Sequence, residues 1–172
     1  MKKVSMVLLF ALVTIVSFGQ DIPKIENGFL TVTLENGVGV EQKVKFSISD
    51  DDYNKIKSSE LFKKWKETTW SNPANAGFIE YHKKWDDVIT YLEGNITSCK
   101  FTLKILKLKN GNSLEFIEGS KGMIYLSDNG GIRISFPFKA QNGYGNSIVG
   151  KTIYSIDMKN GEQKTDCYVY NN

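Results

Sequence analysis

The residue types that most often carry chemistry are scarce in this chain. It contains one histidine, His82, and two cysteines, Cys99 and Cys167. A hydrolase that used His82 would need an activated nucleophile, and the sequence has no Gly-x-Ser-x-Gly turn to supply one. A zinc site usually needs several His or Cys ligands, which this composition hardly provides. We therefore predict no catalytic set, no metal site and no cofactor.

A run of acidic residues offers calcium binding as one possible chemistry. Asp50, Asp52 and Asn54 match the first three ligand positions of an EF-hand loop. Lys55, however, stands where that loop needs Gly, and Leu61 stands where it needs a bidentate Glu. We interpret the run instead as the N-terminal cap of a helix, where carboxylates are favoured by the free amides and the helix dipole.

Glycoside hydrolysis needs only two carboxylates that face one cleft. The candidate pairs are Asp86 with Asp87 and Glu115 with Glu118. Adjacent residues on a helix point about 100° apart, so the aspartate pair is more typical of a solvated surface. The sequence favours a protein without catalytic activity, and a small carboxylate-based hydrolase is a less favoured alternative.

Two polar stretches carry an aromatic residue and are the candidate ligand-binding sites. One lies between predicted helices, and the other is a glycine-flanked loop between predicted strands. An aromatic ring can cover an apolar face of a sugar or peptide while neighbouring amides satisfy its polar groups. The alternative is that both rings merely close the core or pack on their own turn. The candidate residues are Trp70, Asn72, Gln141, Asn142, Tyr144 and Asn146.

Residues 1–19 have the organisation of a secretory signal peptide. Lys2 and Lys3 precede an apolar run, and the small residue Gly19 ends it. The run is shorter than the roughly 20 residues that span a bilayer, although an uncleaved anchor is the alternative. We expect a periplasmic or secreted protein whose mature form is one domain over 20–172.

The charge of the mature chain argues against several partner classes. Removal of Lys2 and Lys3 leaves 20 basic residues against 19 acidic ones, so the net charge falls from +3 to +1. Arg133 is the single arginine, which argues against a nucleic-acid partner. We expect no membrane partner after signal cleavage. We expect the ligand to be a protein, a peptide or a carbohydrate. The Lys-rich, Arg-poor composition is typical of a bacterial export product.

Export permits a disulfide between Cys99 and Cys167. The bond would close a loop of about 69 residues and stabilise the fold by about 4 kcal/mol through chain entropy. We predict this disulfide, with two free thiols as the alternative. The two cysteines would then belong to strands that lie side by side or face each other across a nearly closed sheet.

The N-terminal half reads as a hairpin followed by helices. Alternating apolar residues predict a strand over Phe29–Glu35, a turn at 36–39 and a second strand that ends near Ile48. Three apolar residues then mark a short helix that breaks over Thr68–Asn72. A longer helix begins after Asn72 and ends at Gly94. The apolar faces of these two helices are Leu61, Phe62 and Trp65, and Phe78, Tyr81, Trp85, Val88 and Leu92.

The C-terminal half reads as a block of β-strands. The first predicted strand is Cys99–Lys109, with a β-bulge near 105–106 and a hairpin turn at Asn110-Gly111. Pro137 predicts that its strand lies at a sheet edge or bends. The five further strands are 113–118, 123–127, 132–138, 148–158 and 165–170.

This order of elements predicts an α+β fold. A hairpin, two or three helices and about six antiparallel strands would form a curved sheet or half-barrel packed on the helices. The function that fits best is an exported, non-enzymatic binding or interaction domain of unknown ligand. A secreted inhibitor or immunity-type protein that blocks a partner enzyme with its loops is the alternative.

Overall fold

The computed structural model describes residues 23–75, 86–128 and 130–170. The predicted signal peptide, His82 and the helix residues Phe78, Tyr81 and Trp85 lie outside the described residues. The described elements are β1 (Ile25–Glu26), β2 (Phe29–Glu35), β3 (Glu41–Ser47), α2 (Asp50–Ser58), α3 (Glu60–Ser71), η1 (Pro73–Asn75), α5 (Asp87–Thr102), η2 (Leu103–Lys107), β4 (Asn110–Phe116), β5 (Lys121–Leu126), β6 (Ile132–Gln141), β7 (Ser147–Ile156) and β8 (Gln163–Tyr170).

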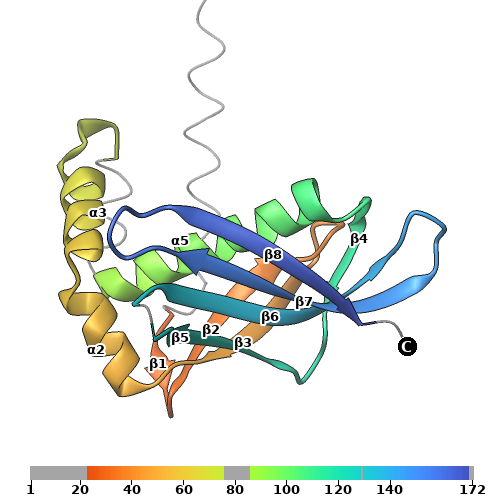
Figure 1. Ribbon diagram of the computed structural model, residues 1–172, viewed down its shortest axis with the longest axis horizontal. Coiled ribbons are helices and arrows are strands. Elements are labelled where there is room, and N and C mark those ends of the chain that lie inside the picture. The colour runs from red at the N-terminus through yellow and green to blue at the C-terminus, as the bar shows by residue number, and fades with distance from the viewer. Residues whose placement is uncertain (1–22, 76–85, 129, 171–172) are drawn as a thin grey trace, which may run out of the picture.

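The strands form one sheet in the order β1-β2-β3-β5-β6-β7-β8. All neighbours are antiparallel except β3 and β5, which run parallel. Strands β4 and β5 share one edge of β6, where β5 pairs with its first half and β4 with its second. Figure 1 shows α5 running along the twisted sheet, with α2 and α3 at one end. The predicted α+β fold with a curved, mostly antiparallel sheet is confirmed.

The predicted N-terminal hairpin is confirmed as β2 and β3. Leu30, Val32 and Leu34 alternate as buried residues on β2, because one face of the hairpin meets the core. The Asn36 side chain holds the turn: its Oδ1 accepts the backbone N–H groups of Val38 and Val40, each at 3.0 Å. The turn predicted at 36–39 is therefore confirmed.

The acidic run is a helix cap, as predicted. Ser49 is the N-cap of α2, and its Oγ accepts the Asp52 backbone N–H at 3.1 Å. The carboxylates of the run occupy the first turn of α2. The next helix, α3, uses Ser59 in the same way and buries Phe62. It ends at Ser71 with Asn72 as its C-cap, inside the break predicted over Thr68–Asn72.

The first strand predicted for the C-terminal block is helical instead. Helix α5 passes through Gly94, which was expected to end it, and continues to Thr102. Its buried stripe continues into η2 and keeps helical spacing throughout. The residues of the stripe are Val88, Leu92, Ile96, Cys99 and Leu103. The alternation of lysines and apolar residues predicts a strand. The helical stripe outweighs this alternation because a helix buries one continuous apolar face against the sheet.

The predicted bulge near 105–106 is a π-helical turn, η2. The Leu108 backbone N–H donates to the Leu103 carbonyl at 3.0 Å, five residues back. The predicted hairpin at Asn110-Gly111 is also wrong, because the chain leaves a helix there and Asn110 begins β4. Asn-Gly favours a hairpin only when strands flank it on both sides.

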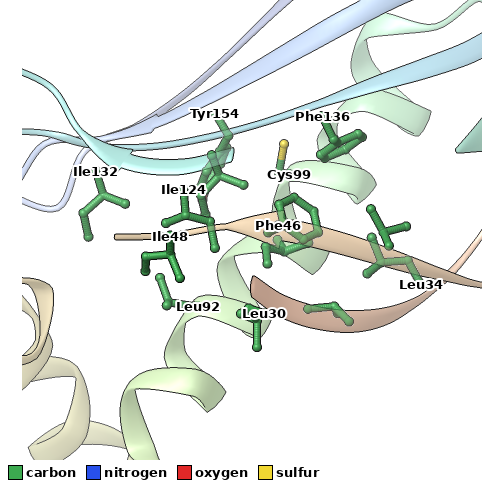
Figure 2. Packing of buried hydrophobic residues seen from close by; sticks show 14 of the residues in the cluster. Leu30, Leu34, Phe46, Ile48, Leu92, Cys99, Ile124, Ile132, Phe136 and Tyr154 are labelled. Carbon is green, nitrogen blue, oxygen red and sulfur yellow. The ribbon is translucent and has the colours of Figure 1, made fainter. Parts of the chain in front are cut away.

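The core lies between α5 and one face of the sheet (Figure 2). The Phe136 ring makes edge-to-face contacts with the Phe46 and Phe116 rings, at centroid distances of 6.1 and 5.5 Å. Leu92 approaches from α5. Gly122 is required beside this cluster, because a Cβ there would lie 2.4 Å from Phe46 Cδ1.

The predicted disulfide between Cys99 and Cys167 is wrong. Both thiols are free. Helix α5 places the Cys99 Sγ 3.8 Å from the Oγ1 of Thr152 on β7, and Thr152 is the register partner of Cys167 on β8. Cys99 therefore lies on a helix and Cys167 on a strand. Thr152, and not Cys99, is the residue opposite Cys167 on the neighbouring strand. Burial raises the pKa of the Cys99 thiol to about 12, partly offset by the Thr152 hydroxyl.

Pro137 lies inside β6, between β7 and the β4–β5 edge, so it does not mark a sheet edge. On the β4–β5 side, pairing with β5 ends at Ser135 and pairing with β4 begins at Phe138. The residue without a backbone N–H thus falls where the ladder on one side is interrupted, which explains its tolerance in a central strand.

Candidate functional site

A polar groove of about 400 Å³ opens between β4 and β6. Seven of its eight lining residues have polar side chains. The lining residues are Asn110, Asn112, Ser113, Glu115, Lys139, Ala140, Gln141 and Ser147. The groove therefore offers mainly amide, hydroxyl and charged groups to a ligand.

An irregular register between β4 and β6 creates this groove. Asn110 pairs with Gln141 and Glu115 pairs with Lys139, so four residues of β4 oppose one residue of β6. The extra residues bend β4 away from the ladder, as in a large β-bulge. Ser113 bridges the gap, because its Oγ accepts the Gln141 backbone N–H at 2.7 Å and donates to the Asn110 carbonyl at 2.6 Å.

The β6–β7 turn stands directly beside the groove. Gln141 and Ser147 are register partners at its base, and both line the groove. The Asn142 Oδ1 accepts the backbone N–H groups of Tyr144 and Asn146 at 2.9 and 3.0 Å. These bonds fix the loop and leave the Tyr144 side chain 91% exposed. The Tyr144 ring therefore projects into solvent and does not pack on its own turn.

Four of the six predicted ligand-binding residues are brought together at this end of the sheet. Gln141 lines the groove and Tyr144 projects beside it, whereas Asn142 and the backbone of Asn146 build the turn. In Asn142 the side-chain carbonyl is engaged, so this residue positions Tyr144.

The other two predicted residues lie elsewhere. Trp70 is in the last turn of α3, and Asn72 caps η1 by accepting the Ala74 backbone N–H at 2.9 Å. Figure 1 shows this end of α3 on the opposite side of the molecule from the β6–β7 turn. The two aromatic loops thus do not form one site, and the Asn72-Pro73 signal marks a short helical turn.

Most of the groove residues were not selected from the sequence. Asn110, Asn112 and Ser113 belong to a stretch that resembled a hairpin turn, and Lys139 gave no signal in its strand. Glu115 was considered only as a possible acid. The available sequence signal was the run of small polar residues after Lys109. Such residues give a strand few apolar side chains to bury, which is typical of an irregular, polar strand.

The two aspartates considered for hydrolysis are each engaged by other groups of the protein. Asp86 is the N-cap of α5 and accepts bonds from the Tyr53 hydroxyl at 2.5 Å and the Val88 N–H at 2.9 Å. Asp87 pairs with Lys66 at 2.6 Å. Burial alone would raise the pKa of Asp86, but the Tyr53 and Val88 hydrogen bonds and the nearby Lys57 ammonium hold this pKa below its usual value. Glu115 is the single carboxylate among the described residues that line the groove.

One acid outside the groove has unusual electrostatics. Burial raises the pKa of Glu93, on α5, to about 7.

In the described part of the chain, no group of three or more His, Cys, Asp or Glu side chains is arranged to hold a metal ion. Among the same described residues, no helix is long and apolar enough to cross a membrane.

Comparisons with protein-family models, curated proteins and solved structures find no match to this chain.

Proposed function

We propose that the protein is an exported, non-enzymatic binding domain that holds an oligosaccharide in the groove between β4 and β6. One observation carries the proposal: a groove lined by amide and hydroxyl side chains adjoins the base of the β6–β7 turn, which carries Tyr144, a tyrosine that is 91% exposed. Export is supported by the signal-peptide pattern of residues 1–19.

The chemistry of the groove fits a hydroxyl-rich ligand. Amides such as Gln141 and Asn112 both donate and accept hydrogen bonds, so they match sugar hydroxyls in either direction. The Tyr144 ring provides a flat apolar face for the C–H side of a sugar ring. An extended peptide fits less well, because the Gln141 backbone N–H is already bonded to Ser113 and cannot extend a strand ladder.

A second candidate function is inhibition of a partner enzyme. The observation that favours it is the position of Tyr144 at the tip of a turn that joins two ten-residue strands and projects from the sheet (Figure 1). Such a turn could enter another protein's active site. In that case the tip would determine affinity and the groove would not.

Binding to an oligosaccharide array followed by calorimetry tests the proposal. We expect Tyr144→Ala and Gln141→Ala each to weaken binding of the selected sugar about tenfold, corresponding to about 1.4 kcal/mol. Tyr168→Ala, on β8, removes another exposed tyrosine and is the matched control. Absence of sugar binding would refute the proposal. One stoichiometric enzyme partner, lost with Tyr144→Ala and kept with Gln141→Ala, would favour the inhibitor.

A further inference from the structure

The surface at the end of α5 is unusually apolar. Phe101, Ile105 and Leu106 expose 60%, 55% and 71% of their side-chain surface, although most large apolar residues of the described chain are buried. Contiguous exposed apolar residues of this kind usually mark an interaction site. We call the surface formed by these three residues with Lys100, Lys107 and Lys109 the basic ridge.

The geometry of η2 keeps the apolar residues of the basic ridge exposed. Cys99 and Leu103 are fully buried and fix the inner side of the helix against the sheet. Phe101 and Ile105 are four residues apart on the outer side. The π-turn widens the helix here, so that Leu106 is exposed as well as Ile105. Turns of this type are rare and often occur at functional sites.

Positive charge is concentrated around these apolar residues. Residues 94–114 contain four lysines and no acidic residue. Without these lysines the mature chain would fall from a net charge of +1 to −3. Lys104 is half-buried and engaged within the protein, because its Nζ donates to the Gly37 carbonyl at 2.6 Å. Lys107 and Lys109 are exposed, and Lys100 is half-buried.

We infer that the basic ridge docks the protein on an anionic lipid bilayer. A basic helix with protruding apolar residues inserts those residues at the boundary of the acyl chains while its lysines meet anionic headgroups. A deformable bilayer needs no preformed pocket that matches these protruding side chains. The neighbouring β2–β3 turn also exposes Val38, but Glu35 and Glu41 pair at its base, so it does not share this charge pattern. The inference does not rest on the sugar proposal, although Lys109 reaches the β6–β7 turn, where a Cβ at Gly143 would lie 3.2 Å from its Cδ. It departs from the expectation of no membrane partner after cleavage.

Vesicle sedimentation tests the inference with the chain from Gln20 onward. This chain contains every strand and helix described here and lacks the apolar run of residues 1–19, which would bind lipid itself. The probes are vesicles of phosphatidylcholine with 30% phosphatidylglycerol, and of phosphatidylcholine alone, at 0.1 M salt. We expect binding to the anionic vesicles only, with weakening at higher salt.

Two triple variants locate the binding surface. Replacing Lys100, Lys107 and Lys109 by Gln should weaken binding about 100-fold, because each lysine near an anionic surface contributes about fivefold. The matching Arg triple variant should retain binding. Replacing Phe101, Ile105 and Leu106 by Ser should weaken binding at least tenfold. The controls are Met123→Ser and a Gln triple variant at exposed lysines elsewhere, namely Lys63, Lys64 and Lys159.

Several outcomes would overturn the inference. They are equal binding to neutral vesicles, no binding to anionic vesicles, and the same loss in the control lysine variant. If the chain ignores vesicles but binds an acidic amphipathic peptide through the same lysines, the basic ridge is a protein-docking surface instead. Circular dichroism checks that each variant is folded. Tyr144→Ala should leave vesicle binding unchanged, so failure here and failure of the sugar proposal are distinguishable.

Discussion

Substituting Gly94 by Ala should stabilise the protein, because Gly94 lies inside α5. A Cβ at this position would meet nothing within 4 Å, and the backbone of Gly94 is not in the left-handed region. The substitution therefore adds no clash and no strain. Glycine inside a helix costs about 0.8–1.0 kcal/mol relative to alanine, mainly because it loses more backbone freedom on folding. We expect the free energy of unfolding to rise by about 1 kcal/mol.

Urea denaturation followed by circular dichroism measures this change. The midpoint should rise while the slope against urea concentration stays constant, because the surface exposed on unfolding is unchanged. The melting temperature should rise by about 3 °C for a domain of this size. Gly150→Ala is the contrasting variant: its Cβ would lie 2.5 Å from Phe138 Cζ and 2.7 Å from the Tyr168 carbonyl oxygen. It should destabilise the fold by about 1–3 kcal/mol.

The sign of the Gly94→Ala effect distinguishes the two interpretations of this residue. A helix that ended at Gly94 would hold it with a positive φ, where alanine is strained and stability would fall by about 1 kcal/mol. A decrease of that size would refute the continuous helix over Asp87–Thr102. It would also remove the structural basis of the basic ridge, because Phe101 would no longer lie on a helix.

Two further predictions concern buried titratable groups. Because burial raises the pKa of Glu93 from 4.5 to about 7, the folded state holds a proton that the unfolded state releases, and stability should fall as pH rises through this window and stay low above it. Glu93→Gln should remove this pH dependence and raise the free energy of unfolding at pH 8 by about 1–2 kcal/mol, allowing for partial solvent screening. Glu67→Gln, at an exposed position, should keep the pH dependence. An unchanged pH dependence in Glu93→Gln would contradict the raised pKa of Glu93. Iodoacetamide at pH 8 should modify half-buried Cys167 at least tenfold faster than buried Cys99 in the native protein, and both in urea. Peptide mass mapping measures the two rates, and a mass loss of two protons in the unreduced protein would show a disulfide instead.

The sequence predicts this fold well wherever a pattern is local. The alternation around Val32, the turn at Asn36 and the cap at Ser49 each arise from neighbouring residues, and the structure has all three. Lys100–Lys109 was misassigned because its period-2 alternation competes with a helical stripe that extends from Val88. Only packing against the whole sheet selects between the two patterns.

The candidate site was predictable only in its turn. Asn142 and Tyr144 are contiguous, and their glycine-flanked loop is a local signal. The groove requires the irregular register between Asn110 and Glu115, which depends on pairing with residues 24 to 31 positions further along the chain. No local pattern encodes that register. For the same reason, the separation of Trp70 from the turn became evident only in three dimensions.

The parallel contact between β3 and β5 has a consequence for how the chain folds. Strands β5 to β8 are joined by short turns, so they can pair soon after one another. The N-terminal hairpin meets β5 through three residue pairs and the Ser47 hydroxyl, which donates to the Gly122 carbonyl 75 residues away. Closing so long a loop is entropically costly, and α5 must already be placed within it. We expect this seam to form last, so that the hairpin and the C-terminal strands behave as two separately opening units in hydrogen exchange.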